Sequence, residues 1–387
     1  MCSVLTSCAT QVTINPASIN TDERAMGAHI MSSSPLTTTV IGSFPKPDYL
    51  PIEDWFDAAR NDGGMNTSLV TKRFTAYENR RSDEDEALFV RAAAEVIDLQ
   101  LRAGVTIPTD GEVRRENYIH YHCRHLDGFD FTDLEHRVLR DGAYETDLPA
   151  IRGTVSHEGR GYAAHDYRAS QDVSAAPVKF TLPGPLTIMD TTADCFYDDR
   201  PRLNRELAAT VNREIRDLVE AGCTYIQVDE PLFARQVEDA LDFGIEGLDR
   251  CFHGVPDNVT KIVHMCCGYP DHLDDEDYKK ADPDSYHRLA RDVDGMGIDQ
   301  ISIEDAHCCN DLNLLGLFQQ MTVIFGSVAV ARSRIETVDE VEARIRAALE
   351  HIDRDRLVIA PDCGLGMLPP DIAETKLKVM CEAAARV

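Results

Sequence analysis

The segment Thr260–Cys267 reads TKIVHMCC, a short run of β-branched and apolar residues that ends in a His-x-Cys pair. Runs of this kind that stop at turn residues predict buried β-strands. His264 and Cys266 fall where the predicted strand runs out, and an imidazole and a thiolate are ligands that zinc accepts. The segment therefore predicts a strand that carries a candidate metal site at its carboxyl end.

The same pattern recurs along the whole chain. Each occurrence is a short β-branched run, and helical patterns with apolar residues three and four positions apart lie between most of them. The eight predicted strands are Thr38–Phe44, Val105–Asp110, Val178–Leu182, Thr224–Asp229, Thr260–Cys266, Gln300–Glu304, Thr322–Val330 and Arg356–Pro361. Eight β/α alternations favour the α/β class and, within it, a (β/α)8 TIM barrel.

The predicted helices end where the sequence supplies a stop signal. The helical pattern of Ala87–Ala103 stops at Gly104, and that of Asn204–Ala221 stops at Gly222. Glycine is expected there because it readily adopts the left-handed backbone that closes a helix. Two further helices are predicted at residues 338–352 and 370–385.

Two connections are longer than a barrel needs. Pro45–Glu86 follows the first predicted strand and Arg114–Pro177 follows the second. We interpret both as insertions because neither contains an obvious linker, and the later part of the second alternates polar and apolar residues like a hairpin. The predicted organisation is a poorly ordered segment at residues 1–36 and a single zinc-binding barrel over residues 37–387.

Charge and composition restrict the partners of the chain. The formal net charge is -28, so no net basic surface is available for nucleic acid or for an anionic membrane. No secretory signal and no run of eighteen apolar residues is visible, which predicts neither export nor a membrane span. We therefore expect the twelve cysteines to be reduced and the protein to be cytoplasmic.

In a barrel, the functional side chains lie at the carboxyl ends of the strands. The chain places polar, glycine or metal-type residues there after nearly every predicted strand: Ser43, Asp110, Glu112, Pro183–Gly184, Asp229, Glu230, His264, Cys266, Glu304 and Cys363. Two thiolates, an imidazole and a carboxylate match a tetrahedral zinc site. Because these ligands lie far apart in sequence, the fold has to assemble them, which favours a catalytic site over a structural zinc knuckle.

Two other clusters could suggest metal sites. The loop stretch EDAHCCND at Glu304–Asp311 offers Asp305 and His307 as competing ligands, and we interpret it as a connection at the rim of the barrel. Three histidines recur at helical spacing in the second insertion, and we interpret them as surface residues or neighbours of the site and not as a second metal site: His120, His122 and His125.

Seven short motifs occur in one order along the chain. They are IGSFP at 41–45, DGE at 110–112, LPGPLT at 182–187, QVDEP at 227–231, HMC at 264–266, SIE at 302–304 and PDCGL at 361–365. From Thr38 to the C-terminus the chain thereby resembles the catalytic barrel of cobalamin-independent methionine synthase. It is most similar to the single-barrel branch of that family, which also includes the epoxyalkane:coenzyme M transferase.

The resemblance implies a zinc ion, Zn2+, and a thiol substrate. The implied ligands are His264, Cys266, Glu304 and Cys363, with Glu304 expected to yield its place as the thiol enters. A free thiol is mostly protonated at neutral pH, whereas a metal-bound thiol is deprotonated and nucleophilic. The implied activity is therefore transfer of a methyl or alkyl group to a zinc-activated thiol.

The motifs also imply where an amino acid would bind. Glu112 and Asp229 match the carboxylates that receive the ammonium group of homocysteine, and Ser43 with the backbone from Ile41 matches the site for its carboxylate. An ammonium group needs acceptors and a carboxylate needs donors, which these residues supply. Asp229 could alternatively be a rim charge, and Ser43 could only turn the chain. The sulfonate of coenzyme M would prefer Arg or Lys.

Two departures from the family pattern concern the methyl donor. An Asp-x-His pair that the family carries after the seventh strand is replaced by Ala329 and Ala331, with Arg332 and Arg334 following. The tryptophan that follows the PGP-T motif is also missing, since the residues there are Met189–Thr192, and the only tryptophan is Trp55 in the first insertion. We therefore expect a methyl donor other than or in addition to methyltetrahydrofolate, such as a methylated corrinoid or its carrier protein.

These observations predict a zinc-dependent S-methyltransferase that converts homocysteine to methionine, with Glu304 and Asp229 as catalytic residues. The first alternative is a zinc-dependent alkyltransferase in which coenzyme M attacks an epoxide, which Arg332 and Arg334 could favour. A zinc hydrolase is a third possibility, although two thiolates would weaken the Lewis acidity of the metal. A non-catalytic zinc-binding protein is a fourth, because the acid and base expected at Ala329 and Ala331 are absent.

Overall fold

The structure is a computed structural model that describes residues 35–56, 67–139, 144–159, 161–268, 270, 272–275, 278, 280–282 and 284–387. The compact unit that contains them is Pro35–Val387. The predicted N-terminal segment, up to residue 34, lies outside the described residues.

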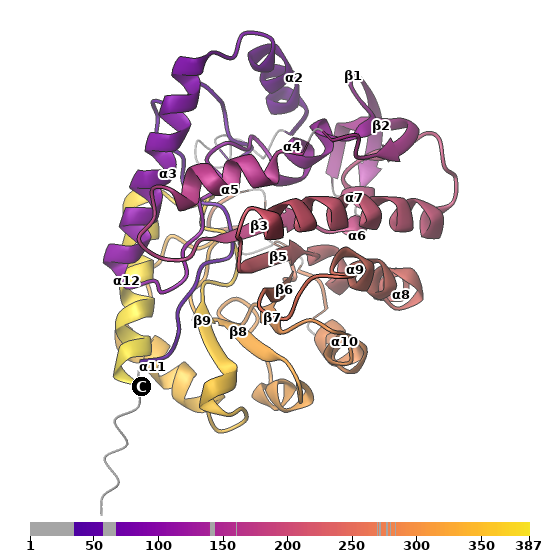
Figure 1. The fold of residues 1–387 in the computed structure, drawn as a ribbon. Helices are drawn as coiled ribbons and strands as arrows, with labels where there is room; N and C mark the ends of the chain where they lie inside the picture. The colour runs from indigo at the N-terminus through magenta and orange to yellow at the C-terminus, as the bar shows by residue number, and fades with distance from the viewer. Residues whose placement is uncertain are drawn as a thin grey trace, which may run out of the picture. The chain divides into compact units, whose positions relative to one another are not determined.

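A six-stranded parallel sheet forms the centre of this unit, in the strand order β3-β5-β6-β7-β8-β9 (Figure 1). Its strands are β3 Lys179–Pro183, β5 Tyr225–Asp229, β6 Thr260–Met265, β7 Gln300–Ile303, β8 Thr322–Gly326 and β9 Leu357–Ala360. Nearly all of their residues are buried, as expected when helices cover a parallel sheet. The last six of the eight predicted strands are therefore confirmed. Their bounds differ by at most one residue at either end, except that the predicted strand Thr322–Val330 already ends at Gly326.

The first two predicted strands are wrong as regular strands. Thr38 and Thr39 make only isolated parallel bridges, to Ile359 of β9 and to Ile107, and Thr109 makes one to Lys179 of β3. Pro108 lacks a backbone N–H and cannot continue a hydrogen-bond ladder, which explains why pairing here stays local. Together these bridges connect the two segments with each other and with the outer strands of the sheet, β9 and β3.

Helices surround the strands on the outside (Figure 1). The α-helices are α2 Thr67–Glu78, α3 Asp83–Ala103, α4 Tyr118–Arg124, α5 Ala163–Gln171, α6 Pro185–Asp190, α7 Arg200–Glu220, α8 Val237–Asp239, α9 Ile245–Cys251, α10 Asp284–Asp294, α11 Val338–Ala348 and α12 Pro370–Arg386. Shorter helical turns are η2 Pro231–Ala234, η3 Ala240–Gly244, η4 Leu312–Leu317 and η5 Arg354–Arg356. None of the described helices is long and apolar enough to cross a bilayer.

The helix ends follow the sequence signals. Gly104 closes α3 with a left-handed φ of 104°. Ser82 and Asp85 form a capping box at the start of α3, and Thr337 and Glu340 form another at the start of α11. Each box satisfies backbone N–H groups that would otherwise have no partner, so the short motifs fix the helix starts.

The long connection before β3 contains the predicted hairpin. Strands β1 Asp127–Leu139 and β2 Tyr144–Ser156 pair antiparallel, and the short strand β4 Ala193–Asp194 adds to β2 in parallel. The three strands form a separate sheet beside α4 (Figure 1). The alternation of polar and apolar residues therefore predicted this element correctly. No disulfide joins the cysteines that the structure describes.

Packing of the amphipathic helix α7 tests the assignment of the core. Leu207 of α7 is completely buried, whereas Leu241 is 39% exposed. Replacing Leu207 with Ala should lower the free energy of unfolding by about 2–5 kcal/mol, because it removes buried methyl groups and leaves a cavity. The change Leu241→Ala should cost about 0.5 kcal/mol or less. Urea denaturation of both variants checks this, and equal losses would contradict the packing described.

Candidate metal centre and substrate pocket

Three metal-type side chains come together at the carboxyl ends of two strands. His264 lies in β6, Cys266 follows that strand, and Cys363 follows β9. The Nε2 atom of His264 lies 3.1 Å from Sγ of Cys363, and the two sulfur atoms lie 3.9 Å apart. All three side chains are buried, and their ligand atoms lie within 4.8 Å of one another. The structure thus brings together three of the four predicted ligands.

The surroundings of this group favour metal binding. The Nδ1 atom of His264 pairs with Oγ of Ser302 at 2.9 Å, which leaves Nε2 facing the two sulfur atoms. Burial lowers the pKa of His264, but the hydrogen bond with Cys266 and the charges of Cys266 and Asp229 together outweigh burial, so the pKa is raised. The hydrogen bond with Cys363 holds the pKa of the Cys266 thiol well below its usual range. Thiolate character of this kind is what a metal requires.

The spacing of the sulfur atoms also fits a zinc ion. Zn–S bonds of about 2.3 Å at the tetrahedral angle place two sulfur ligands about 3.8 Å apart. The sulfur atoms of Cys266 and Cys363 are 3.9 Å apart. With the imidazole of His264 they could hold zinc as three protein ligands and leave a further position, which is the arrangement of catalytic zinc sites.

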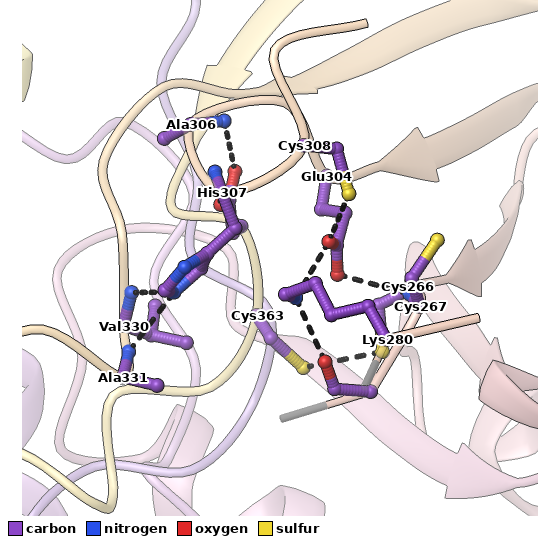
Figure 2. A network of polar contacts seen from close by, with 12 residues as sticks. Cys266, Cys267, Lys280, Glu304, Ala306, His307, Cys308, Val330, Ala331 and Cys363 are labelled. Carbon is purple, nitrogen blue, oxygen red and sulfur yellow. Dashed lines mark hydrogen bonds and ion pairs between the residues drawn. The ribbon is translucent and has the colours of Figure 1, made fainter. Parts of the chain in front are cut away.

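Glu304, the fourth predicted ligand, is not part of this group in the structure. Its Oε1 atom accepts hydrogen bonds from Nζ of Lys280 at 2.7 Å and from Sγ of Cys308 at 2.6 Å. Its Oε2 atom accepts one from the backbone N–H of Cys267 at 2.9 Å. Figure 2 shows the carboxylate enclosed by these partners. Glu304 therefore forms a second cluster with Cys267 and Cys308, next to the first.

The connection after β7 is fixed by a buried carboxylate that the sequence analysis did not single out. Asp362 accepts hydrogen bonds from the backbone N–H groups of Asp305, Ala306 and His307 at 2.7–2.9 Å. Burial raises the pKa of Asp362 to about 8. Because Asp362 precedes Cys363, this contact ties the ligand cysteine to the loop that begins at Glu304. The sequence did offer a signal for Asp362, because this residue belongs to the PDCGL motif at 361–365.

The two competing ligands of that loop have other partners and do not belong to the candidate metal group of His264, Cys266 and Cys363. Asp305 binds both Nε and Nη2 of Arg344 at 2.7 Å. His307 accepts the backbone N–H groups of Val330 and Ala331 at its Nε2 atom, at 3.2 and 3.1 Å (Figure 2). Burial lowers the pKa of His307 to about 3, so its imidazole is neutral. A histidine thus lies against the stretch in which the family pair is replaced by alanines.

A pocket of about 130 Å³ opens beside the metal group. It collects the predicted binding residues from several strand ends. Its lining includes Ile41, Gly42, Ser43, Trp55, Phe56, Glu112, Tyr118, Asp229, Arg235, His264, Cys266, Cys363 and Gly364. All the predicted substrate-binding residues therefore face one cavity together with three of the predicted zinc ligands.

Two carboxylates in this pocket, Glu112 and Asp229, are buried. Oε1 of Glu112 accepts a hydrogen bond from Thr181 Oγ1 at 2.8 Å and lies 3.5 Å from Arg115. Glu112 has a φ of 56°, a left-handed backbone that is strained for a residue with a side chain. Burial raises the pKa of Glu112 and raises that of Asp229 to about 7. An ammonium group entering the pocket would stabilise both carboxylates in their charged form.

An aromatic wall completes the pocket, and the sequence analysis missed it. The rings of Trp55 and Phe56 lie 4.9 Å apart, and those of Trp55 and Tyr118 lie 6.0 Å apart. The sequence places Trp55, the single tryptophan, in the first insertion but predicts no role for it. Of the two positions expected for the histidines of the second insertion, the surface position is wrong for His120 and His122, because both are buried. Burial lowers the pKa of His120 to about 4, so it is neutral there.

The fold and the site together define an α/β protein with one histidine and two cysteines, a candidate metal group, at the strand ends of a parallel sheet. A family model described as "Cobalamin-independent synthase, Catalytic domain" matches residues 36–386. The chain belongs to this family.

Curated relatives and solved structures agree with the family. A methionine synthase of Saccharolobus islandicus is 30% identical over 359 residues, covering 91% of this chain and 95% of the relative. The methionine synthase of Sulfolobus acidocaldarius is 28% identical, covering 88% of this chain and 89% of the relative.

Among solved structures, a B12-independent methionine synthase from Shewanella sp. W3-18-1 in complex with selenomethionine matches with a TM-score of 0.77. It is 28% identical, and the match covers 91% of this chain and 97% of that chain. A methyltransferase from Methanosarcina mazei, at 14% identity and a TM-score of 0.52, shares the fold.

Glu230 supplies a pH test of the buried charges. Its carboxylate accepts hydrogen bonds from Leu186 N at 2.9 Å and from Thr187 Oγ1 at 2.7 Å. Burial raises its pKa to about 8, above the value of about 4.3 in an unfolded chain. The folded protein then binds the proton more tightly, so this stabilising contribution is full below about pH 4 and is lost as the pH rises through about 8.

The expected result is that wild-type stability falls, relative to Glu230→Gln, between pH 5 and 8. The loss should be about 1.4 kcal/mol for each pH unit over which only the folded state is protonated. Denaturation midpoints of both proteins at several pH values measure it. Parallel curves for the two proteins would show that Glu230 is ionised in the fold throughout this range.

Proposed function

We propose that the protein is a zinc-dependent S-methyltransferase of the methionine synthase type, which transfers a methyl group to homocysteine. The observation that carries the proposal is one pocket that combines His264, Cys266 and Cys363 with the carboxylates Glu112 and Asp229. Membership of the family supports methyl transfer, and the names of the relatives support homocysteine as the acceptor. The same membership argues against a hydrolase or a non-catalytic scaffold.

The proposed cofactor is Zn2+, held by His264, Cys266 and Cys363, with Glu304 as the predicted fourth ligand. Zinc, when bound, supplies a positive charge that keeps the substrate sulfur in its nucleophilic thiolate form. The chain itself orients the substrate. Glu112 and Asp229 would receive the ammonium group, and Ser43 with the backbone from Ile41 would receive the carboxylate.

The proposal also includes the finer architecture, an eight-stranded (β/α)8 barrel with long insertions after its first two strands. It is supported by the parallel bridges of Thr38, Thr39 and Thr109, which connect β9 to β3 through two short segments. A sheet closed into a barrel by these bridges would explain why the segments near Ser43 and Glu112 reach the same pocket as β5, β6 and β9.

The methyl donor would approach the substrate thiol from the aromatic side of the pocket. The aromatic wall of Trp55, Phe56 and Tyr118 offers an apolar surface beside the metal group. Family membership gives no support to a methylated corrinoid or its carrier protein. A donor other than, or in addition to, methyltetrahydrofolate remains our prediction, because Ala329 and Ala331 replace the family pair. The cytoplasmic compartment also stays a prediction.

The coenzyme M alternative requires a cation for the sulfonate. Arg235 lines the pocket, but its Nη2 atom donates to the backbone carbonyl of Cys267 at 3.2 Å and to the hydroxyl of Tyr278. Arg334 pairs with Glu340 and is exposed, as is Arg332. The two buried carboxylates favour an aminothiol over a sulfonate.

The proposed function is tested with the cobalt-substituted protein. Titration with homocysteine should produce a new sulfur-to-cobalt absorption band, because the substrate thiol becomes a ligand of the metal. Titration with coenzyme M should not. The variant Cys363→Ser should lose metal retention and methyl transfer, since it removes one of three converging ligands. A fully active, metal-replete Cys363→Ser protein would disprove the site assignment, and a response to coenzyme M alone would favour the alternative.

The ammonium site is tested by Glu112→Gln. Removing one charged partner of the ammonium group should weaken homocysteine binding by roughly 10- to 100-fold, the equivalent of a charge-assisted hydrogen bond. Calorimetry with the metal-loaded protein measures the affinity. The matched control ligand is 4-mercaptobutyrate, which lacks the amino group and should bind both proteins equally. Unchanged affinity for homocysteine would remove Glu112 from the site.

A further inference from the structure

A buried chain of polar side chains runs from β3 through β5 to the substrate pocket. Lys179 of β3 donates a hydrogen bond from Nζ to Oε1 of Gln227 in β5, at 2.5 Å. Gln227 in turn donates from Nε2 to Oδ1 of Asp229 at 2.7 Å and to the backbone carbonyl of Ile41 at 3.0 Å. Lys179 is 1% exposed and Gln227 is completely buried, so water cannot replace these partners. None of these hydrogen bonds involves a proposed metal ligand.

The three partners fix the orientation of the Gln227 amide. A carboxylate and a carbonyl only accept hydrogen bonds, so the amide has to present its nitrogen to Asp229 and Ile41. Its oxygen then faces the amino group of Lys179, which supplies the donor. Burial lowers the pKa of Lys179 to about 7, and its Nζ carries N–H groups to donate in either protonation state. Turning the amide over would lose all three hydrogen bonds, so Gln227 has one arrangement.

The two acceptors of Gln227 belong to the two halves of the proposed amino-acid site. Asp229 is a proposed partner of the substrate ammonium group, and the backbone from Ile41 is part of the proposed site for the substrate carboxylate. Among the described residues, Gln227 donates the only hydrogen bond to the Asp229 carboxylate, and it uses Oδ1, which leaves Oδ2 for a substrate. One buried amide therefore joins the two halves of the site directly.

The other proposed ammonium partner is anchored from the same level of the sheet. Thr181 of β3 pairs with Gln227 of β5 in the parallel register. Its Oγ1 atom donates a hydrogen bond to Oε1 of Glu112 at 2.8 Å. Adjacent positions of two strands thus hold both carboxylates, and Gln227 extends this anchor to Ile41.

We propose that Gln227, held by Lys179, is a positioning residue that sets the distance between the ammonium and carboxylate halves of the site and so selects an α-amino-acid thiol. The inference rests on the proposed function, because homocysteine carries both groups on one carbon. A site already fixed at that spacing binds both groups without the cost of ordering its own side chains. A substrate with a different spacing cannot fill both halves at once.

The test compares two thiols that differ only in this spacing. Homocysteine and 3-amino-5-mercaptopentanoate separate thiol and amino group equally, but the second has one more carbon before its carboxylate. Calorimetry with the metal-loaded protein measures both affinities. Wild type should prefer homocysteine by about 10- to 200-fold, the effect of one additional methylene group. Gln227→Met should lower this preference by roughly tenfold, because Asp229 and Ile41 are then no longer joined.

Three further variants separate positioning from stability. Gln100→Met is the matched control, since Gln100 is also completely buried and its amide makes two hydrogen bonds, both to the backbone of Thr109. It should lose stability in urea but keep the wild-type preference. Gln227→Asn keeps an amide that is too short to join both halves, so it should act like Gln227→Met even if that protein does not fold. Lys179→Met should lower the preference in wild type and change it no further in the Gln227→Met background.

The inference is overturned if the variants of Gln227 keep the wild-type preference, or if wild type binds both thiols equally. It is also overturned if Gln100→Met loses the preference to the same extent, because loss of any buried amide would then be sufficient. A further loss from Lys179→Met in the Gln227→Met background would show that Lys179 does not act through Gln227.

The outcome also separates the inference from the proposed function. If homocysteine gives a sulfur-to-cobalt band with the cobalt-substituted wild type while the variants of Gln227 keep its preference, only the role of Gln227 fails. If wild type gives no such band, the proposed function fails and the inference fails with it.

Discussion

The parallel hydrogen-bond register of the central sheet is the constraint on which the site depends. It aligns Asp229 of β5 with His264 of β6, so a proposed substrate-binding residue and a proposed metal ligand occupy the same level at the carboxyl edge. The same edge brings Cys363 to within 3.1 Å of His264, although the two residues are 99 positions apart. A slip of one residue in any of these strands would turn the side chains to the other face of the sheet and disperse the group.

Buried charge is the second organising feature, and the charges beside Cys363 and the end of β6 have structural partners. Asp362 binds three backbone N–H groups of the connection after β7, and Lys280 binds Glu304 within that same region. These contacts link Cys363, the start of the loop and the end of β6 into one rigid unit. Removing charges from water is costly unless they are paired, so the network also specifies a single arrangement of the metal group.

Predictions from the sequence were wrong or incomplete where one local pattern is compatible with more than one tertiary arrangement. Thr38–Phe44 and Val105–Asp110 have strand-like composition, but Pro108 limits pairing to isolated bridges. His120 and His122 recur at helical spacing in α4, but the spacing does not reveal that both side chains are buried. Trp55 was visible as the only tryptophan, but its place beside Tyr118 depends on an insertion packing across the pocket.

The sequence by itself determined most of the segments that become strands and helices, and which side chains follow the strands, because periodicity, capping residues and ligand chemistry are local properties. It therefore predicted His264, Cys266 and Cys363 as candidate ligands, and the family resemblance added Glu112 and Asp229 as candidate binding residues, before any distance was known. Only the tertiary structure decided which of these donors converge, that Glu304 turns to Lys280, and that aromatic rings line the pocket. Those outcomes depend on distances between segments far apart in the chain, and packing sets such distances, not local pattern.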